Sequence, residues 1–222
     1  MVLRGVAKVI SLLFHPLLML TYMTVLLLII QPFWFGVNQI SEKIPLLLAV
    51  FFSSFLIPGV AVLMMRFLGL VESMELRDKK ERIGPYIVAA IFYLWLYINF
   101  RHDPSTPPLF SALVLGCVIG LFLAFFVNIF SKISAHAVGM GGLLGMLIIL
   151  LGMGPVDPVL IPLGSLGVLQ TTLGTLLLLV ILLAGAVGTS RLLLKAHEAI
   201  DLYGGYMVGL IAQFVSFRLL ML

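Results

Sequence analysis

A histidine, an arginine and an aspartate stand close together near the C-terminal end of a largely apolar chain. In the segment Ser190–Asp201, Arg191 precedes His197 by six residues and Asp201 follows it by four. If the segment is helical, the Asp201 carboxylate lies one turn from the imidazole and can orient it, while Arg191 reaches the same side. A fixed cation beside an oriented imidazole suits phosphoryl transfer, in which negative charge spreads over oxygen atoms.

Composition indicates what kind of scaffold must position these groups. Of the 222 residues, 62% are hydrophobic and only 10% are charged, whereas charged residues make up about 25% of an ordinary soluble domain. We therefore expect an all-α integral membrane protein, with residues 1–222 forming a single transmembrane domain of about six to seven helices. The one cysteine, Cys117, excludes an internal disulfide and a CxxC site.

Apolar segments divide the chain into expected spans. The third is short for a ~20-residue span, so we expect it to be tilted or partly interfacial. His15-Pro16 interrupts the first span, and Pro58-Gly59 is expected to kink the second. Residues 161–167 are expected to form a partly buried connection, and the glycines of the fifth and last spans to let helices approach closely. The segments are 9–30, 44–70, 86–100, 109–130, 134–151, 169–188 and one that follows His197.

Counting these spans places three polar clusters on one membrane face. The clusters are the charged loop 72–82, the pair Ser134 and His136, and the segment Ser190–Asp201. The loops 31–43, 101–108 and 152–162 and the C-terminus fall on the other face. Such convergence is what an active site at a membrane interface requires.

Two of the clusters resemble motifs of a known family. Ser190-Arg191, five residues, His197, three residues and Asp201 match the third motif of the type 2 phosphatidic acid phosphatase superfamily without a gap. The second motif, Pro-Ser-Gly-His, is similar to residues 133–136, with Ile133 for proline and Ala135 for glycine. The resemblance implies a phosphatase-like core at about residues 72–222.

The first motif of that family, Lys, six residues, Arg-Pro, is only partly present. Aligned on Pro85, the chain has Arg77 in place of the lysine and Gly84 in place of the arginine. Lys79 and Arg82 lie nearby and are expected to supply the missing charges from a shifted register.

The resemblance implies a metal-independent lipid phosphatase that works without a cofactor through a phosphohistidine intermediate. His197 would be the nucleophile, Asp201 would fix its tautomer, and His136 would protonate the leaving oxygen. The phosphate oxygens would be held by Arg191, Ser134, Ser190, Arg77, Lys79 and Arg82. The expected substrate is a phosphomonoester or pyrophosphate of a lipid, of the phosphatidic acid, phosphatidylglycerophosphate or isoprenoid pyrophosphate type, which enters from the bilayer.

Other interpretations stay open. The same scaffold could transfer the phospho group to another lipid, or serve as a non-catalytic binder or transporter. His197 with Asp201 could be a structural ion pair, His136 a solvated interfacial residue, and the loop 72–82 a plain solvated loop. We interpret His15 as a helix-packing group. The expected partners are the bilayer and a lipid phosphate, with no nucleic acid, and homo-oligomerisation is left open.

The distribution of basic residues predicts an orientation. Ten of the 13 lysines and arginines fall on the face with the polar clusters, and Lys43, Arg101 and Arg218 fall on the other. The positive-inside rule then places the candidate site in the cytoplasm and the C-terminus outside. We expect a protein of the bacterial cytoplasmic membrane.

Overall fold

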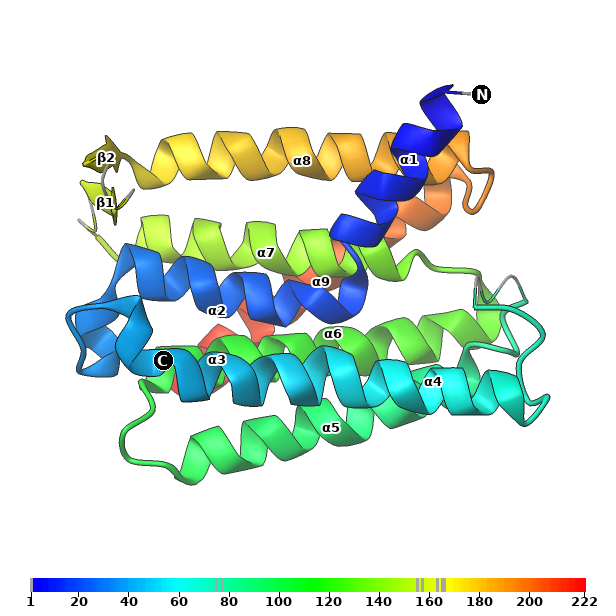
Figure 1. Ribbon diagram of the computed structural model, residues 1–222, viewed down its shortest axis with the longest axis horizontal. Helices are drawn as coiled ribbons and strands as arrows, with labels where there is room; N and C mark the ends of the chain where they lie inside the picture. Colours follow the sequence, from blue (N-terminus) through cyan, green and yellow to red (C-terminus); the bar gives the residue numbers. More distant parts are fainter. Residues whose placement is uncertain are drawn as a thin grey trace.

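The computed structural model is a bundle of long helices that run side by side, with a small two-stranded sheet at one end (Figure 1). It describes residues 2–74, 76, 78–154, 156, 158–162, 164 and 167–222. Within these residues, seven helical segments are long and apolar enough to cross a membrane: Val2–Ile30, Pro32–Phe67, Ile83–His102, Pro108–Phe130, Ala135–Gly152, Leu173–Leu193 and Ala199–Met221. The predicted all-α membrane bundle is confirmed.

The outer surface of the bundle is apolar. Phe67, Phe130 and Leu182 each expose 70% or more of their surface. Exposed apolar area costs about 25 cal/mol per Å² in water, and soluble monomers avoid large patches of it. Helices satisfy their backbone hydrogen bonds internally, which is what a lipid environment demands. The surface is therefore suited to contact with hydrocarbon.

The first span is broken where the sequence places a proline. Helix α1 (Val2–Leu13) ends before His15, whose extended backbone is typical of the residue before a proline. The 3₁₀ turn η1 (Pro16–Leu18) and helix α2 (Met19–Ile30) follow. The break lets α1 leave the direction of α2 and cross the end of α8 obliquely (Figure 1).

The second span is distorted just before its proline rather than at the predicted Pro58-Gly59 pair. The 3₁₀ turns η2 (Pro32–Phe35) and η3 (Ile40–Lys43) lead into α3 (Ile44–Phe51), the π-helical segment η4 (Phe52–Leu56) and α4 (Ile57–Phe67). Pro58 has no N–H for the carbonyl one turn earlier. The helix adapts there, with the amide of Ile57 donating to the carbonyl of Phe52.

The third span is longer than predicted. Helix α5 covers Ile83–His102, which is 20 residues, so the expectation of a short, partly interfacial segment was wrong. Pro85 is tolerated because the first N–H groups of a helix have no intrahelical partner. Helix α6 (Pro108–Phe130) returns beside α5 and ends next to the loop that precedes α5.

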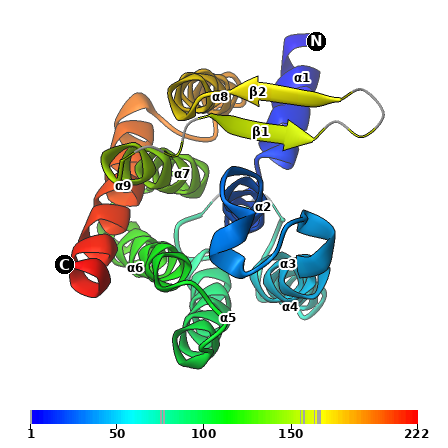
Figure 2. The ribbon, with the colours of Figure 1, turned by 90° about the vertical axis from the view of Figure 1, so that its left-hand side faces the viewer.

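The connection after the fifth span is a β-hairpin, which the sequence analysis did not predict. Helix α7 (Ala135–Gly152) is followed by β1 (Val159–Pro162) and β2 (Val168–Thr171), paired antiparallel. Val159 is fully buried, and β1 packs on α2. The hairpin leads into α8 (Leu173–Leu193), and α9 (Ala199–Met221) ends the chain. Figure 2 shows the hairpin across the end of the bundle beside α8.

Helices α7 and α9 run in the same direction and pack closely through glycines. A Cβ at Gly209 would collide with the Val138 carbonyl, and one at Gly141 with the Tyr206 carbonyl. A Cβ at Gly205 would lie 2.8 Å from the Ser134 carbonyl. The predicted close approach is confirmed for these positions, whereas Gly204 faces open space. Small residues allow such contacts between membrane helices.

The main hydrophobic core lies toward the hairpin end of the bundle. Its fully buried members include Leu28, Leu96, Phe110, Leu147 and Leu150, which come from four different helices. At the other end a smaller buried cluster holds Tyr86, Ala124 and Ile133. The packed end thus holds the helices together, and the opposite end carries the polar groups described next.

Candidate active site

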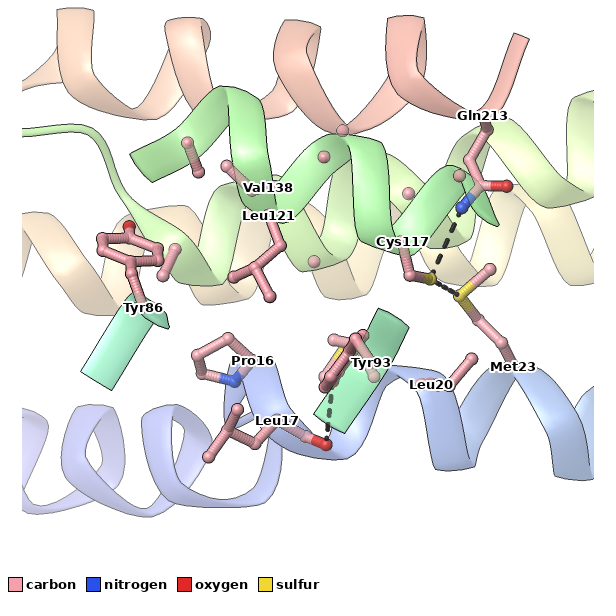
Figure 3. Close-up of a pocket in the computed structure, with 18 residues that line it drawn as sticks. Pro16, Leu17, Leu20, Met23, Tyr86, Tyr93, Cys117, Leu121, Val138 and Gln213 are labelled. Carbon is pink, nitrogen blue, oxygen red and sulfur yellow. Dashed lines mark hydrogen bonds between the residues drawn. The ribbon is translucent and has the colours of Figure 1, made fainter. Parts of the chain in front are cut away.

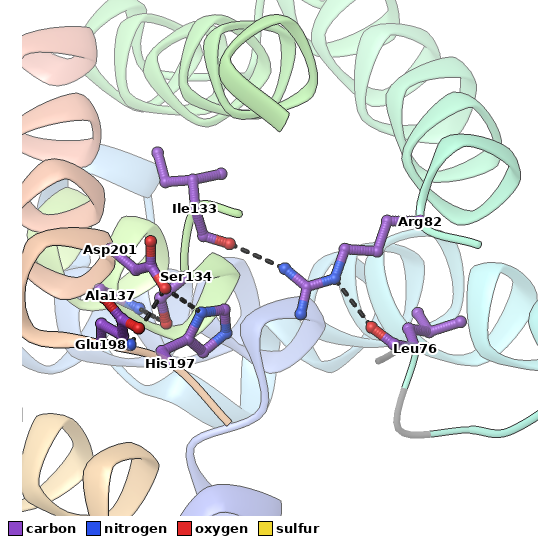
Figure 4. Close-up of polar contacts among 8 residues, drawn as sticks. All are labelled: Leu76, Arg82, Ile133, Ser134, Ala137, His197, Glu198 and Asp201. Atoms are coloured by element: carbon purple, nitrogen blue, oxygen red, sulfur yellow. Dashed lines mark hydrogen bonds and ion pairs between the residues drawn. The ribbon is translucent and has the colours of Figure 1, made fainter. Parts of the chain in front are cut away.

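The polar clusters from three parts of the chain meet at the end of the bundle opposite the hairpin. The amide of Ser134, which precedes α7, donates to the carbonyl of Asp201 in the first turn of α9 over 3.3 Å. The Arg82 guanidinium, at the start of α5, donates to the Ile133 carbonyl over 2.9 Å. Figure 4 shows these contacts around His197. The convergence predicted by counting spans is therefore present in the structure.

His197 does not lie on a helix, contrary to the assumption made from its spacing. Helix α8 ends at Leu193, a turn follows in which Lys195 has a φ of 52°, and α9 begins at Ala199. The contact to Asp201 forms nevertheless, with Nδ1 of His197 3.3 Å from Oδ2 of the carboxylate. The same oxygen accepts the backbone N–H of Glu198 over 3.1 Å. Asp201 is thus a helix-capping residue that also holds the imidazole.

This contact defines the tautomer of His197. A carboxylate only accepts, so Nδ1 carries the hydrogen and Nε2 of the neutral ring keeps its lone pair. The side chain of His197 is 2% exposed. Burial lowers the pKa of His197 well below its ordinary value, and the charges of Arg82 and Arg191 lower it further, while Asp201 opposes them. His197 is therefore neutral at pH 7.

Arg82 is the buried cation of the site. Its side chain is enclosed between two loops, because Nε donates to the Leu76 carbonyl over 2.9 Å and a terminal nitrogen donates to Ile133. Only 8% of Arg82 is exposed. Its charge acts on both His197 and Asp201. Among the described basic residues expected from the loop before α5, Arg82 is thus the one whose charge acts on His197.

Arg191 supplies a second cation from the last turn of α8. Its charge acts on His15, His136 and His197, which places it within reach of all three imidazoles. The neighbouring Ser190 is buried and donates its hydroxyl to the Ala186 carbonyl over 2.8 Å. The Ser190 hydroxyl is therefore bonded within its own helix, and the predicted contact with phosphate would require a different rotamer.

Lys79 and Arg77 were the remaining cations expected from the loop before α5. The Lys79 ammonium donates to the carbonyls of Ile129 and Phe130 at the C-terminal end of α6, at 3.0 and 3.5 Å. The Lys79 carbonyl in turn accepts from the Asn128 amide over 2.8 Å. These bonds fasten the loop to α6, so Lys79 is engaged away from the imidazoles. Arg77 lies outside the described residues.

Ser134 and His136 lie at the start of α7. Ser134 is the N-cap, fully buried, and its hydroxyl accepts the Ala137 amide. The Nε2 atom of His136 lies 3.0 Å from the Ser11 carbonyl of α1. A carbonyl only accepts, so Nε2 carries the hydrogen and a second proton would reside on Nδ1. His136 lies within electrostatic reach of Arg191 and His197.

His15, interpreted from the sequence as a helix-packing residue, lies against His136 in the structure. The two ring centroids are 5.8 Å apart with the planes at 75°. Nδ1 of His15 accepts the Leu17 amide at the start of η1. The signal in the sequence was a histidine at a proline break inside an apolar span. The contact itself depends on how α1 packs across α8, which no local pattern reveals.

The arrangement provides a neutral imidazole, a second imidazole and two cations at one end of the bundle. The N-termini of α7 and α9 lie at the same end, capped by Ser134 and by Glu198 with Asp201. Among the described residues, no three His, Cys, Asp or Glu side chains lie together as metal ligands. A family-model scan, a search of curated proteins and a search of solved structures gave no match to this chain.

Proposed function

We propose that the chain is a membrane-embedded phosphatase that removes phosphate from a lipid phosphate or pyrophosphate. The observation that carries this proposal is the neutral His197, held through Nδ1 by Asp201 within the field of Arg82 and Arg191. A buried imidazole beside two cations is poorly suited to a purely structural ion pair, because the cations oppose its protonation. It is well suited to attack phosphorus.

In the proposed first step, Nε2 of His197 attacks phosphorus while the bond from phosphorus to the lipid oxygen breaks. Nδ1 of His136 takes the proton of a monoanionic phosphate group and gives it to that oxygen, so the lipid alcohol, or the lipid monophosphate if the substrate is a pyrophosphate, leaves neutralised. Arg82 and Arg191 hold the phosphoryl oxygens as their charge develops.

In the second step, water attacks the phosphohistidine. His136 takes a proton from the water on Nδ1, the nitrogen–phosphorus bond breaks, and inorganic phosphate leaves with that proton. Asp201 stabilises the imidazolium character of His197 while it carries the phosphoryl group. The two steps return both histidines to their starting protonation states, so the cycle needs no further reagent.

The apolar exterior supports a lipid substrate. The site lies at the ends of helices whose outer faces are suited to hydrocarbon. A phosphate at the interface can reach it while its tail stays in the bilayer. From the distribution of basic residues we also propose that the site faces the cytoplasm.

The test is a substrate panel with purified protein. Phosphatidic acid, phosphatidylglycerophosphate and undecaprenyl pyrophosphate are each incubated with and without EDTA, and phosphate release is measured. We expect release that survives EDTA, is abolished in His197→Ala, and is accompanied by acid-labile radioactive phosphate on residue 197. Transfer of label to a second lipid would identify a phosphotransferase instead. Inertness toward every substrate would overturn the proposal in favour of a non-catalytic protein.

A further inference from the structure

A narrow pocket lies inside the helix bundle beside the candidate site. It has a volume of about 70 Å³ and is lined by η1, α2, α5, α6, α7 and α9 (Figure 3). Ala135, between Ser134 and His136, lines it, as does Tyr86, which follows Arg82 by one helical turn. One end of the pocket therefore borders the residues proposed to bind phosphate.

The pocket is long and thin. On α6 its lining extends from Gly116 to Ala124, which corresponds to about 12 Å at a rise of ~1.5 Å per residue. A water molecule needs roughly 10–15 Å³ of such volume, so the space holds about five waters in a row. One extended chain fits this shape, whereas two parallel chains do not.

The walls are hydrocarbon, with polar groups near the two ends. Leu121 and Val138 line the middle, and Figure 3 shows Tyr86 and Gln213 at opposite ends. The amide nitrogen of Gln213 donates to the Leu113 carbonyl. The hydroxyl of Tyr86, a residue 7% exposed, has no hydrogen-bond partner among the residues that the structure describes. A buried hydroxyl without a partner is destabilising, and a ligand oxygen at the phosphate end would bond to it.

We propose that this pocket holds the first part of a single hydrocarbon chain of the substrate, and that the Tyr86 hydroxyl binds an oxygen of the phosphate group. The substrate is then the phosphate or pyrophosphate of a long single-chain alcohol, not of a diacylglycerol. This inference rests on the proposed function, because a phosphate bound at His197 defines which end of the hydrocarbon chain lies in the pocket next to Tyr86.

The test uses an alkyl phosphonate with twelve carbons and a diazirine in its chain, whose carbon–phosphorus bond resists hydrolysis. The probe is photolysed with the wild-type protein, and labelled peptides are mapped. We expect labelling at pocket residues such as Cys117 and Leu121, and competition by farnesyl phosphate that is at least about tenfold stronger than by dioleoyl phosphatidic acid. Labelling confined to the lipid-facing residues Phe122 and Phe126 would overturn the inference, as would equal competition by the two lipids.

Two variants and one control sharpen the result. Leu121→Trp fills the middle of the pocket and should abolish the labelling, whereas Leu123→Trp, on the 38%-exposed outer side of the same helix, should leave it unchanged. Tyr86→Phe removes only the hydroxyl and should weaken probe binding about fivefold, the worth of one hydrogen bond. Pocket labelling that is insensitive to Leu121→Trp and Tyr86→Phe would contradict the inference.

The two proposals fail separately. If the wild-type protein releases phosphate from lipids but the probe labels only the outer surface, the pocket inference is wrong and the phosphatase proposal stands. If the probe labels the pocket with the expected competition but no phosphate is released, the phosphatase proposal is wrong, and the pocket is a binding site for single-chain lipids.

Discussion

The backbone amide of Ser134 bonds to the backbone carbonyl of Asp201, joining the residue before α7 to the first turn of α9. The glycine contacts between the two helices continue this backbone-level packing toward the middle of the bundle. The segments that carry His136 and His197 are therefore joined by a main-chain contact. Two motifs that are far apart in the sequence thereby become parts of one site.

The first prediction concerns this helix pair. Gly209→Ala places a Cβ against the Val138 carbonyl, where neither backbone can yield. We expect a loss of about 1–3 kcal/mol in the free energy of unfolding, together with reduced turnover. Gly204→Ala is the matched control, since nothing lies within 4 Å of its new methyl group. Thermal unfolding in detergent compares the two, and equal melting temperatures would contradict close packing at Gly209.

The second prediction concerns the nucleophile. His197→Gln keeps a polar side chain but cannot form the phosphohistidine, so lipid phosphate hydrolysis should fall by at least about a thousandfold. His102→Gln, at the hairpin end of α5, should retain wild-type activity. Phosphate release and trapping of labelled protein measure both. Retained turnover in His197→Gln would exclude this residue as the nucleophile.

The third prediction concerns the general acid. His136→Asn should lower kcat for an alkyl phosphate by about 10²–10⁴-fold, the usual contribution of acid catalysis. The loss should be far smaller for p-nitrophenyl phosphate, whose leaving oxygen needs no proton. An equal loss with both substrates would assign His136 to binding instead.

The contact from α1 to His136 should give the same signature. Deletion of residues 1–12 removes the Ser11 carbonyl that orients Nε2. The truncated protein should lose activity toward alkyl phosphates more than toward p-nitrophenyl phosphate. Circular dichroism checks that the remaining helices are intact. Equal activity of the truncated and full-length proteins would show that α1 does not position the acid.

The fourth prediction is a pH dependence. The folded-state pKa of His197 lies below the ordinary value of 6.5, so activity should persist as the pH falls below 6.5 and be lost only near the lowered pKa. The unfolded chain takes up its proton at about 6.5, so the free energy of unfolding should decrease as the pH falls between these two values.

Arg82→Gln tests the cause of this shift. Without the guanidinium charge the imidazolium is less disfavoured, so the pKa of His197 rises and the acidic limb of kcat/KM moves to higher pH. Lys79→Gln is the matched control, because its ammonium caps α6. It should leave the limb in place while lowering stability. An acidic limb that is unchanged in Arg82→Gln would refute the electrostatic link between the two residues.

The fifth prediction concerns orientation. Helix α9 ends near the hairpin end, opposite the candidate site (Figure 1). A periplasmic reporter such as alkaline phosphatase, fused after Leu222, should be active if the site faces the cytoplasm, and a fused green fluorescent protein should be dark. The reverse pattern would place the site outside.

Much of the fold was predictable because the length of each apolar segment largely decides whether it spans a membrane. Apolar runs predicted the spans, and counting them predicted that the polar clusters meet at one end. The β-hairpin was missed because its strands are four residues each and continue the apolar composition of their neighbours. The distortion of the second span at η4 arises because Pro58 cannot donate a backbone hydrogen bond. How the helix adjusts its hydrogen bonds there depends on packing, which the sequence does not reveal.

The site was predictable in its residue types but not in its details. The spacing from His197 to Asp201 suggested that both residues lie on one helix. In the structure His197 precedes α9, and the Asp201 carboxylate contacts the imidazole while it caps that helix. Arg82 could be separated from Lys79 only by their hydrogen-bond partners, since both are basic residues of one loop. The roles of Ser11 and His15 depend on tertiary packing of α1.

The two cations beside His197 have a practical consequence. The attraction of the candidate site for an anion comes from Arg82 and Arg191, so a substitution at His197 does not remove it. A chain disabled in its chemistry would still collect its phosphorylated ligand and hold it without turnover. Such a variant is the natural choice for capturing the bound lipid from a membrane extract and reading its identity by mass spectrometry.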